Sequence, residues 1–151
     1  MAREAPGALS SLEDRAHGVE LTLPADPELF SLARLTVSTV AARLDFTIED
    51  IEDLRLAVDE LCTICAKGAG AGSRLRLCLA SDARTLRVEC SVNGVTEIPG
   101  ERGELLAGMT ADELSLRILS ELVDAYTLSP LSDGIREGSI EKRRATPDAG
   151  N

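Results

Sequence analysis

Aromatic side chains are scarce in this 151-residue sequence, which has no Trp, two Phe and one Tyr. Proteins bind single-stranded nucleic acids largely by stacking bases on aromatic rings, so this scarcity argues against that function. Basic residues are also few: 16 of them against 26 acidic residues give a net charge of −10. Binding to DNA phosphates needs a basic surface, so direct nucleic-acid binding is not expected. An acidic domain instead suits a basic protein partner, because opposite charges steer their encounter.

Long apolar runs are lacking as well. No stretch approaches the roughly 20 residues that span a bilayer, and the N-terminal residues MAREAPGALSSLEDRAHG do not have the layout of a secretory signal. We therefore expect a cytoplasmic protein without membrane contact, whose four cysteines are reduced thiols. Hydrophobic residues make up 44% of the chain, so a core of Leu, Val, Ile and Ala is expected.

The pattern along the chain predicts one domain over residues 17–144, between a disordered arm (1–16) and a disordered tail (145–151). Alternating residues predict strands at 19–23, 74–79, 85–92, 126–129 and about 138–143. Helical periods predict helices at 27–44, 47–67 and 111–125, the last capped by Thr110, and residues 93–110 are expected to form a loop. This order predicts an α/β two-layer sandwich, with helices on one face of a mixed, mainly antiparallel sheet.

The helix at 47–67 is the longest of the three. Thr47 and Asp50 form a capping-box pattern at its start, and the run Gly68 to Gly70 ends it. Its core-facing stripe comprises Ile51, Leu54, Val58, Leu61 and Cys65. The adjacent face carries Asp53, Ala57, Glu60, Ile64 and Lys67. In the last helix, the spacing of the apolar residues places Leu114, Ile118 and Leu122 inward.

Two other patterns have both a structural and a functional interpretation. Cys62 and Cys65 form a C-x-x-C, but zinc would need a second close pair, and a redox motif would lie at a helix N-terminus. We expect all four cysteines to be small core residues. Arg74, Arg76 and Arg87 are expected to form the solvated face of a hairpin, with partner binding as the alternative.

The sequence segments around Glu60 resemble those of a known family. LRLAVDELCT resembles the N-box of the GHKL (Bergerat-fold) ATPase superfamily, and more closely that of the RsbW/SpoIIAB group of bacterial anti-sigma factors that are also serine kinases. LRILSELVDAYTL resembles the last helix and following strand of that group, and GSIEKRR its closing strand. The resemblance extends over residues 19–143 and implies the same fold.

The resemblance assigns roles to individual positions. Glu60 matches the glutamate that acts as general base, whereas Ile64 stands where the family has its magnesium-binding asparagine. Ile64 offers no oxygen ligand, and magnesium requires oxygen ligands. Asn93 and Gly94 fall on the D-x-G-x-G motif that holds adenine, with its Asp lost. The later G-x-G motif, where glycines let backbone amides approach phosphates, falls on Glu113, Leu114 and Ser115.

These assignments lead to an expected function. The sequence resembles a degenerate, actinobacterial sigma-F-class member of the group, which would sequester an alternative sigma factor and be countered by a STAS-type anti-anti-sigma protein. A homodimer is implied by the family, and no cofactor is expected. One alternative is an active serine/threonine kinase that uses ATP and magnesium to phosphorylate the anti-anti-sigma protein. Another is a non-catalytic module that binds a different target.

Overall fold

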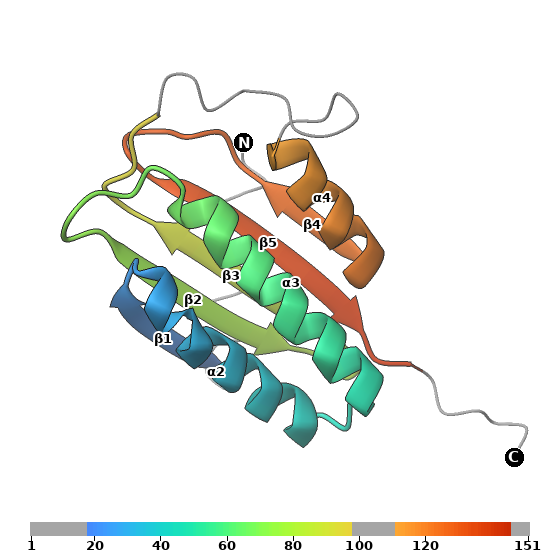
Figure 1. Cartoon of the computed structure of the whole chain (residues 1–151). Helices are drawn as coiled ribbons and strands as arrows, with labels where there is room; N and C mark the ends of the chain where they lie inside the picture. Colours follow the sequence, from blue (N-terminus) through green and yellow to red (C-terminus); the bar gives the residue numbers. More distant parts are fainter. Residues whose placement is uncertain (1–17, 98–110, 146–151) are drawn as a thin grey trace, which may run out of the picture.

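A five-stranded sheet covered on one face by helices forms the framework of the molecule (Figure 1). The computed structural model describes residues 18–97 and 111–145. Along the chain, the elements are β1 (Val19–Pro24), η2 (Pro27–Leu29), α2 (Phe30–Arg43), α3 (Ile48–Ala66), β2 (Arg74–Ser81), β3 (Thr85–Val92), α4 (Ala111–Leu122), β4 (Ala125–Leu128) and β5 (Arg136–Arg143). The predicted two-layer α/β sandwich is confirmed.

The strands lie in the order β1-β2-β3-β5-β4, and in the described part of the chain each of the four strand pairs is antiparallel. Alternation decides which side chains face the helices: Leu75, Leu77 and Leu79 of β2 are buried, while Arg74 and Arg76 are exposed on the other face. The arginine-bearing face is therefore the solvated one, as the hairpin pattern predicts.

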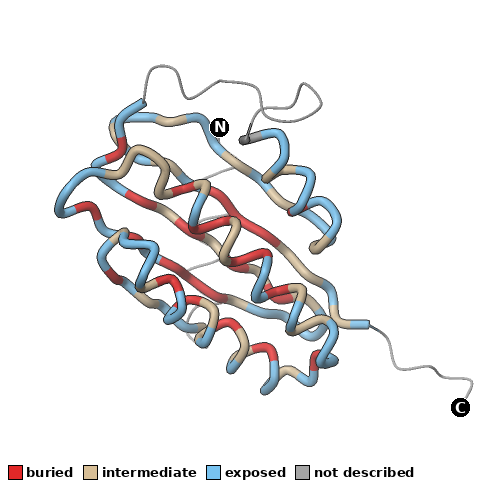
Figure 2. The backbone as a smooth tube through the Cα atoms, in the orientation of Figure 1, coloured by how far each residue is buried: buried red, intermediate tan, exposed pale blue. Residues whose placement is uncertain are grey.

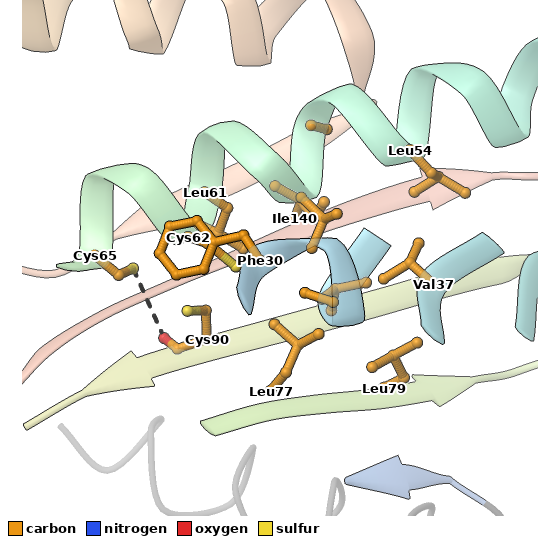
Figure 3. Close-up of a cluster of buried hydrophobic side chains, with 14 of the residues drawn as sticks. Phe30, Val37, Leu54, Leu61, Cys62, Cys65, Leu77, Leu79, Cys90 and Ile140 are labelled. Carbon is orange, nitrogen blue, oxygen red and sulfur yellow. Dashed lines mark hydrogen bonds between the residues drawn. The ribbon is translucent and has the colours of Figure 1, made fainter. Parts of the chain in front are cut away.

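Helix α3 lies across the middle of the sheet, between α2 and α4 (Figure 1). The backbone N–H of Asp50 donates to Thr47 Oγ1 at 3.1 Å, which confirms Thr47 as the N-cap. Gly68 follows the helix with φ +83°, a left-handed conformation that favours glycine. The predicted stripe is confirmed as core, since Leu54, Val58, Leu61 and Cys65 are fully buried and Ile51 is half-buried (Figure 3).

Two further residues of α3 are buried that the stripe did not include. The sequence pattern places Ala57 on the adjacent face, but its exposure is 0%, as is that of Cys62. Both lie beside the stripe, where α3 is covered by its neighbours on both sides. A helix that packs against a sheet and between two other helices needs a wider apolar surface than a single stripe.

Helix α2 begins one turn later than the sequence pattern suggests. The residues after Asp26 form the single 3-10 turn η2, which Asp26 caps by accepting a hydrogen bond from the Glu28 N–H at 3.0 Å. The inward face of α2 consists of Phe30, Ala33, Val37 and Ala41. Leu29, Val40 and Leu44, which flank this face, are only partly buried.

The predicted inward face of α4 is wrong at Leu114 and Ile118 but is confirmed at Leu122, which packs against the core. Leu114 and Ile118 are 43% and 37% exposed, whereas Leu119 is fully buried and Leu122 half-buried. Figure 2 shows that α4 is mostly coloured as exposed, whereas α3 has several buried segments. The helix is rotated so that Ser115, Leu119 and Leu122 follow the side that packs inward. It also ends at Leu122 rather than near Ala125, because β4 begins at Ala125.

Several predictions fall on parts of the chain that the structure does not describe. These are the arm at 1–16, most of the tail at 145–151, Thr110 as a helix cap, and the loop beyond Glu97. Among the described helices, none is both long and apolar enough to cross a membrane.

Candidate functional site

Glu60, the predicted general base, lies on the side of α3 that faces α4. Its Oε2 accepts a hydrogen bond from Ser115 Oγ at 2.7 Å, and both side chains are half-buried. Ser115 belongs to the segment that the family resemblance assigns to the later G-x-G motif. One oxygen of the Glu60 carboxylate therefore accepts a hydrogen bond from a hydroxyl of its own chain.

Ile64 lies one turn beyond Glu60 and packs partly buried against the core. Its backbone oxygen, with that of Lys67, accepts hydrogen bonds from Arg136 Nη1 of β5 at 3.4 and 2.5 Å. The guanidinium satisfies carbonyls at the end of α3 and places a positive charge at the negative end of the helix dipole. Sequence reasoning missed Arg136, because its partners lie about 70 residues away in the chain.

Asn93 and Gly94, the predicted remnant of the adenine site, join the end of β3 to the start of β2. Asn93 Oδ1 accepts a hydrogen bond from the Arg74 N–H at 2.8 Å, and Gly94 O accepts one from Ser73 Oγ at 3.2 Å. Gly94 has φ +65°, and a Cβ there would meet Ser73 Oγ at 2.6 Å. Both residues thus have a structural task, and their part in nucleotide binding stays a prediction.

Three segments meet at the same end of the sheet. Thr96 N–H donates to Gly68 O at 3.1 Å, and Val95 N–H donates to Gly134 O at 2.9 Å. An isolated bridge also pairs Ala69 with Val95. The loop after α3, the end of β3 and the turn before β5 are therefore fixed to one another by backbone hydrogen bonds.

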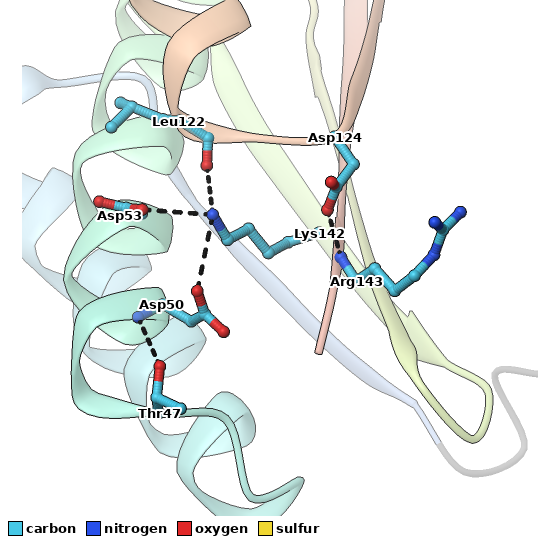
Figure 4. Close-up of polar contacts among 7 residues, drawn as sticks. All are labelled: Thr47, Asp50, Asp53, Leu122, Asp124, Lys142 and Arg143. Atoms are coloured by element: carbon cyan, nitrogen blue, oxygen red, sulfur yellow. Dashed lines mark hydrogen bonds and ion pairs between the residues drawn. The ribbon is translucent and has the colours of Figure 1, made fainter. Parts of the chain in front are cut away.

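Lys142 of β5 contacts both the N-terminal part of α3 and the C-terminal end of α4 (Figure 4). Its Nζ donates to Leu122 O at 2.7 Å and to Asp53 Oδ2 at 3.2 Å, and lies 3.8 Å from Asp50 Oδ1. Asp50, which the capping-box pattern assigned to Thr47, therefore directs its carboxylate to this cluster. The Lys142 side chain is only 13% exposed, so these contacts are largely shielded from water.

The cysteines are core residues, as predicted: all four are free thiols and buried. Cys62 and Cys65 of α3 lie above Cys90 of β3 (Figure 3). Hydrogen bonds with these two thiols, together with burial, raise the pKa of Cys90 well above its usual value. Raised pKa values oppose formation of the reactive thiolate. In the described residues, no group of three or more His, Cys, Asp or Glu is arranged to hold a metal ion.

Comparison with known proteins decides the family. The histidine kinase-like ATPase domain matches residues 23–134. The chain belongs to this family. It is 51% identical over 45 residues to the serine-protein kinase RsbW of Bacillus velezensis, covering 30% of this chain and 28% of that protein. It is 48% identical over 54 residues to the serine-protein kinase RsbW of Listeria monocytogenes serotype 4a, covering 36% and 34%. The resemblance to RsbW-type members is thereby confirmed.

The matched segments span about a third of the length of these RsbW kinases. A solved structure of the RsbU and RsbW domains of Rv1364c from Mycobacterium tuberculosis has the same fold, with a TM-score of 0.60 at 17% identity. The similarity covers 86% of this chain and 33% of that one. Within this histidine kinase-like ATPase fold, Glu60 and Ile64 occupy adjacent turns of α3, and Ser115 approaches Glu60 from α4.

Proposed function

We propose that this protein is an anti-sigma factor that sequesters an alternative RNA polymerase sigma factor by direct contact. A STAS-type anti-anti-sigma protein would compete for it and release the sigma factor. Membership of the family and the similarity to RsbW kinases support this proposal. Under this proposal the protein acts in the cytoplasm, where RNA polymerase acts. We also propose that it forms a homodimer, and light scattering on the purified protein tests this.

The observation that carries the proposal is the hydrogen bond between Ser115 and Glu60. A general base must reach the proton that it removes from the substrate. Glu60 Oε2 instead accepts a hydrogen bond from within the chain, and the next turn carries Ile64 in place of a magnesium ligand. Both features favour binding over phosphoryl transfer.

Magnesium ATP fits these residues poorly. Ile64 supplies no oxygen, and Asn93 Oδ1 already accepts a backbone hydrogen bond from Arg74. In the alignment that the resemblance implies, Glu113 adds a negative charge where a triphosphate would lie. We therefore derive no reaction step through ATP and propose that switching rests on competing protein affinities.

One observation favours a second candidate function, a serine/threonine kinase acting on the anti-anti-sigma protein. Glu60 is retained, and the matched relatives are named serine-protein kinases. A thermal unfolding series with magnesium ATP separates the two functions, since ligand at a hundred times Kd stabilises a protein by about 2.7 kcal/mol. Clear stabilisation, with phosphate transfer to a STAS protein that is lost in Glu60→Ala, would establish the kinase.

The direct test of the leading proposal is co-purification of the full chain from its native cells, followed by identification of the bound protein. A stoichiometric sigma factor, displaced by a purified STAS protein, is the expected result. Recovery of another target without any sigma factor would favour a regulatory module of a different kind.

A further inference from the structure

Four large apolar side chains are exposed in the described residues of α3 and α4. Ile48 is the first residue of α3, and the other three lie further along the two helices. Leu56 is 58% exposed, Leu114 43% and Ile118 37%. Single exposed leucines are ordinary, but apolar side chains that gather on one surface mark interaction sites. Whether these three form one surface depends on how α3 and α4 are aligned.

Two contacts fix that alignment. At one end, Ser115 of α4 bonds Glu60 of α3, and at the other, Lys142 bridges Asp53 of α3 and Leu122 of α4. The helices are therefore antiparallel, with residue 115 level with 60 and 122 level with 53. At 1.5 Å per residue, Leu56 and Ile118 lie at the same height to within about 2 Å.

Helical spacing places two of these residues beside the contact between the helices. Leu56 lies one turn from Glu60 on α3, and Ile118 lies one turn from Ser115 on α4, so both are adjacent to the Ser115–Glu60 hydrogen bond. Leu114 is one turn from Ile118 on the same side of α4. We call these three residues, Leu56, Leu114 and Ile118, the α3–α4 strip.

The two helices that carry the strip are rich in negative charge. The sequence of α3 holds six carboxylates and one arginine, and that of α4 three carboxylates and one arginine. The two helices together therefore have a net charge of −7. Two cations from other elements contact α3 carboxylates: Arg34 contacts Asp59, and Lys142 contacts Asp50 and Asp53. With these two cations counted, the surface keeps a net charge of −5 (−7 + 2), so it remains acidic. Helix α2, by contrast, has two arginines and no carboxylate. On the open face of the sheet, Arg76 pairs with Glu20, and Arg87 with Glu89 and Glu141.

We propose that the α3–α4 strip is the docking site for a basic amphipathic helix of a partner protein. Its apolar residues would contact Leu56 and Ile118, and its lysines or arginines would lie against the surrounding carboxylates. A second copy of the chain is a poor occupant, because two acidic faces would repel each other. The chain's own first 17 residues are no better, since their acidic residues outnumber their arginines.

This inference deepens the proposed function, on which it rests in one respect: the sigma factor would supply the basic helix. The first arm of the test does not depend on that. The probe is a fluorescein-labelled peptide helix of about 18 residues, with a stripe of leucines flanked by lysines. The control peptide, its acidic twin, has glutamate in place of each lysine. We expect the basic peptide to bind the full chain at least tenfold more tightly than the twin, and to weaken at high salt.

Matched variants localise the binding. Leu56→Ser combined with Ile118→Ser should weaken the basic peptide roughly tenfold, because two apolar contacts are lost. The control is Leu32→Ser combined with Leu35→Ser on α2, where the side chains are 44% and 64% exposed, and it should change affinity less than about twofold. All four positions are exposed, so circular dichroism should show unchanged folding. Equal binding of the two peptides, or equal weakening by the two variants, would overturn the proposal.

The second arm uses the sigma factor that co-purifies with the chain. If it binds wild type and the Leu56→Ser/Ile118→Ser variant equally, the docking site is wrong and the proposed function stands. If no sigma factor binds while the peptide still depends on the strip, the proposed function fails and the docking site stands.

Discussion

Ser115 on α4 donates a hydrogen bond to Glu60 on α3 at 2.7 Å, and so connects the two helices through the residue that we predict to match the family's base. The pair lies 55 residues apart in sequence and spans the seam beside the α3–α4 strip. One contact thus bears on both stability and function. It positions α4, and it engages the Glu60 carboxylate.

We expect Ser115→Ala to lower the free energy of unfolding by about 1 kcal/mol, the usual net contribution of one hydrogen bond. Ser120→Ala is the matched control, because Ser120 Oγ is exposed and bonds only locally, to Arg117 O. Its cost should be below about 0.5 kcal/mol. Urea unfolding of the three proteins measures both values, and equal losses would mean that the Glu60 contact contributes nothing.

Glycine positions after α3 give a second prediction. Gly68 and Gly72 both have φ +83°, but a Cβ on Gly68 would lie 2.1 Å from Thr96 O, whereas one on Gly72 would meet nothing within 4 Å. Gly72→Ala should therefore cost about 1–2 kcal/mol, from backbone conformation alone. Gly68→Ala carries the same cost plus a clash with backbone, and should lower stability further or prevent folding. The measurement is thermal or urea unfolding of both variants, and similar losses would refute the clash.

Lys142 provides the third prediction. Lys142→Met keeps much of the side-chain volume but leaves Asp50 and Asp53 without their cation. Breaking a buried ion pair costs about 3–5 kcal/mol, and because Asp53 is 40% exposed we expect about 2–3 kcal/mol here. Arg76→Met is the control: the Arg76–Glu20 pair is about half exposed and should contribute less than about 1 kcal/mol. Unfolding curves in which both variants lose the same stability would contradict a shielded cluster.

Asp82, in the β2–β3 turn, gives a prediction about pH. Hydrogen bonds from the backbone N–H groups of Arg84 and Thr85 lower the pKa of Asp82 below its usual value. A folded-state pKa below the unfolded one contributes stability that is present above the unfolded pKa of about 3.9 and is lost as pH falls through the folded value. The stability difference between wild type and Asp82→Asn should be constant above about pH 5 and shrink below pH 4.

Unfolding measured from pH 7 to pH 2.5 tests this expectation. A difference that stays constant over the whole range would show that Asp82 titrates alike in the folded and unfolded chain.

The sequence predicts correctly those elements whose periodicity allows only one choice of buried face. Strict alternation in β2 and β3, and the Thr47 cap with the stripe of α3, define both the element and its buried face. The helix at 111–122 differs, because LSLRILSEL supports two stripes with helical spacing, through Leu114 and Ile118 or through Leu119 and Leu122. Contacts with α3 select the second, and periodicity within α4 does not contain that information.

In the candidate site, too, local sequence does not reveal contacts with residues far along the chain. Glu60 and Ile64 can be found from the residues that surround them, since they lie within one helical segment. Arg136 and Lys142 cannot, because each reaches partners 69 to 89 residues earlier in the chain. Such contacts are decided by the register of β5 in the sheet, which places both residues beside α3.

Among the α4 side chains whose burial is described, Leu119 alone is fully buried, whereas α3 buries six residues. Such an imbalance gives the two helices different opening free energies, since local unfolding is opposed mainly by buried apolar contact. Backbone amides of α4 should therefore exchange with deuterium well before those of α3. Because Leu114 and Ile118 are carried by this early-opening helix, a partner bound across the strip would slow that exchange. Deuterium uptake in α4 thus reports on occupancy of the surface without any label on the partner.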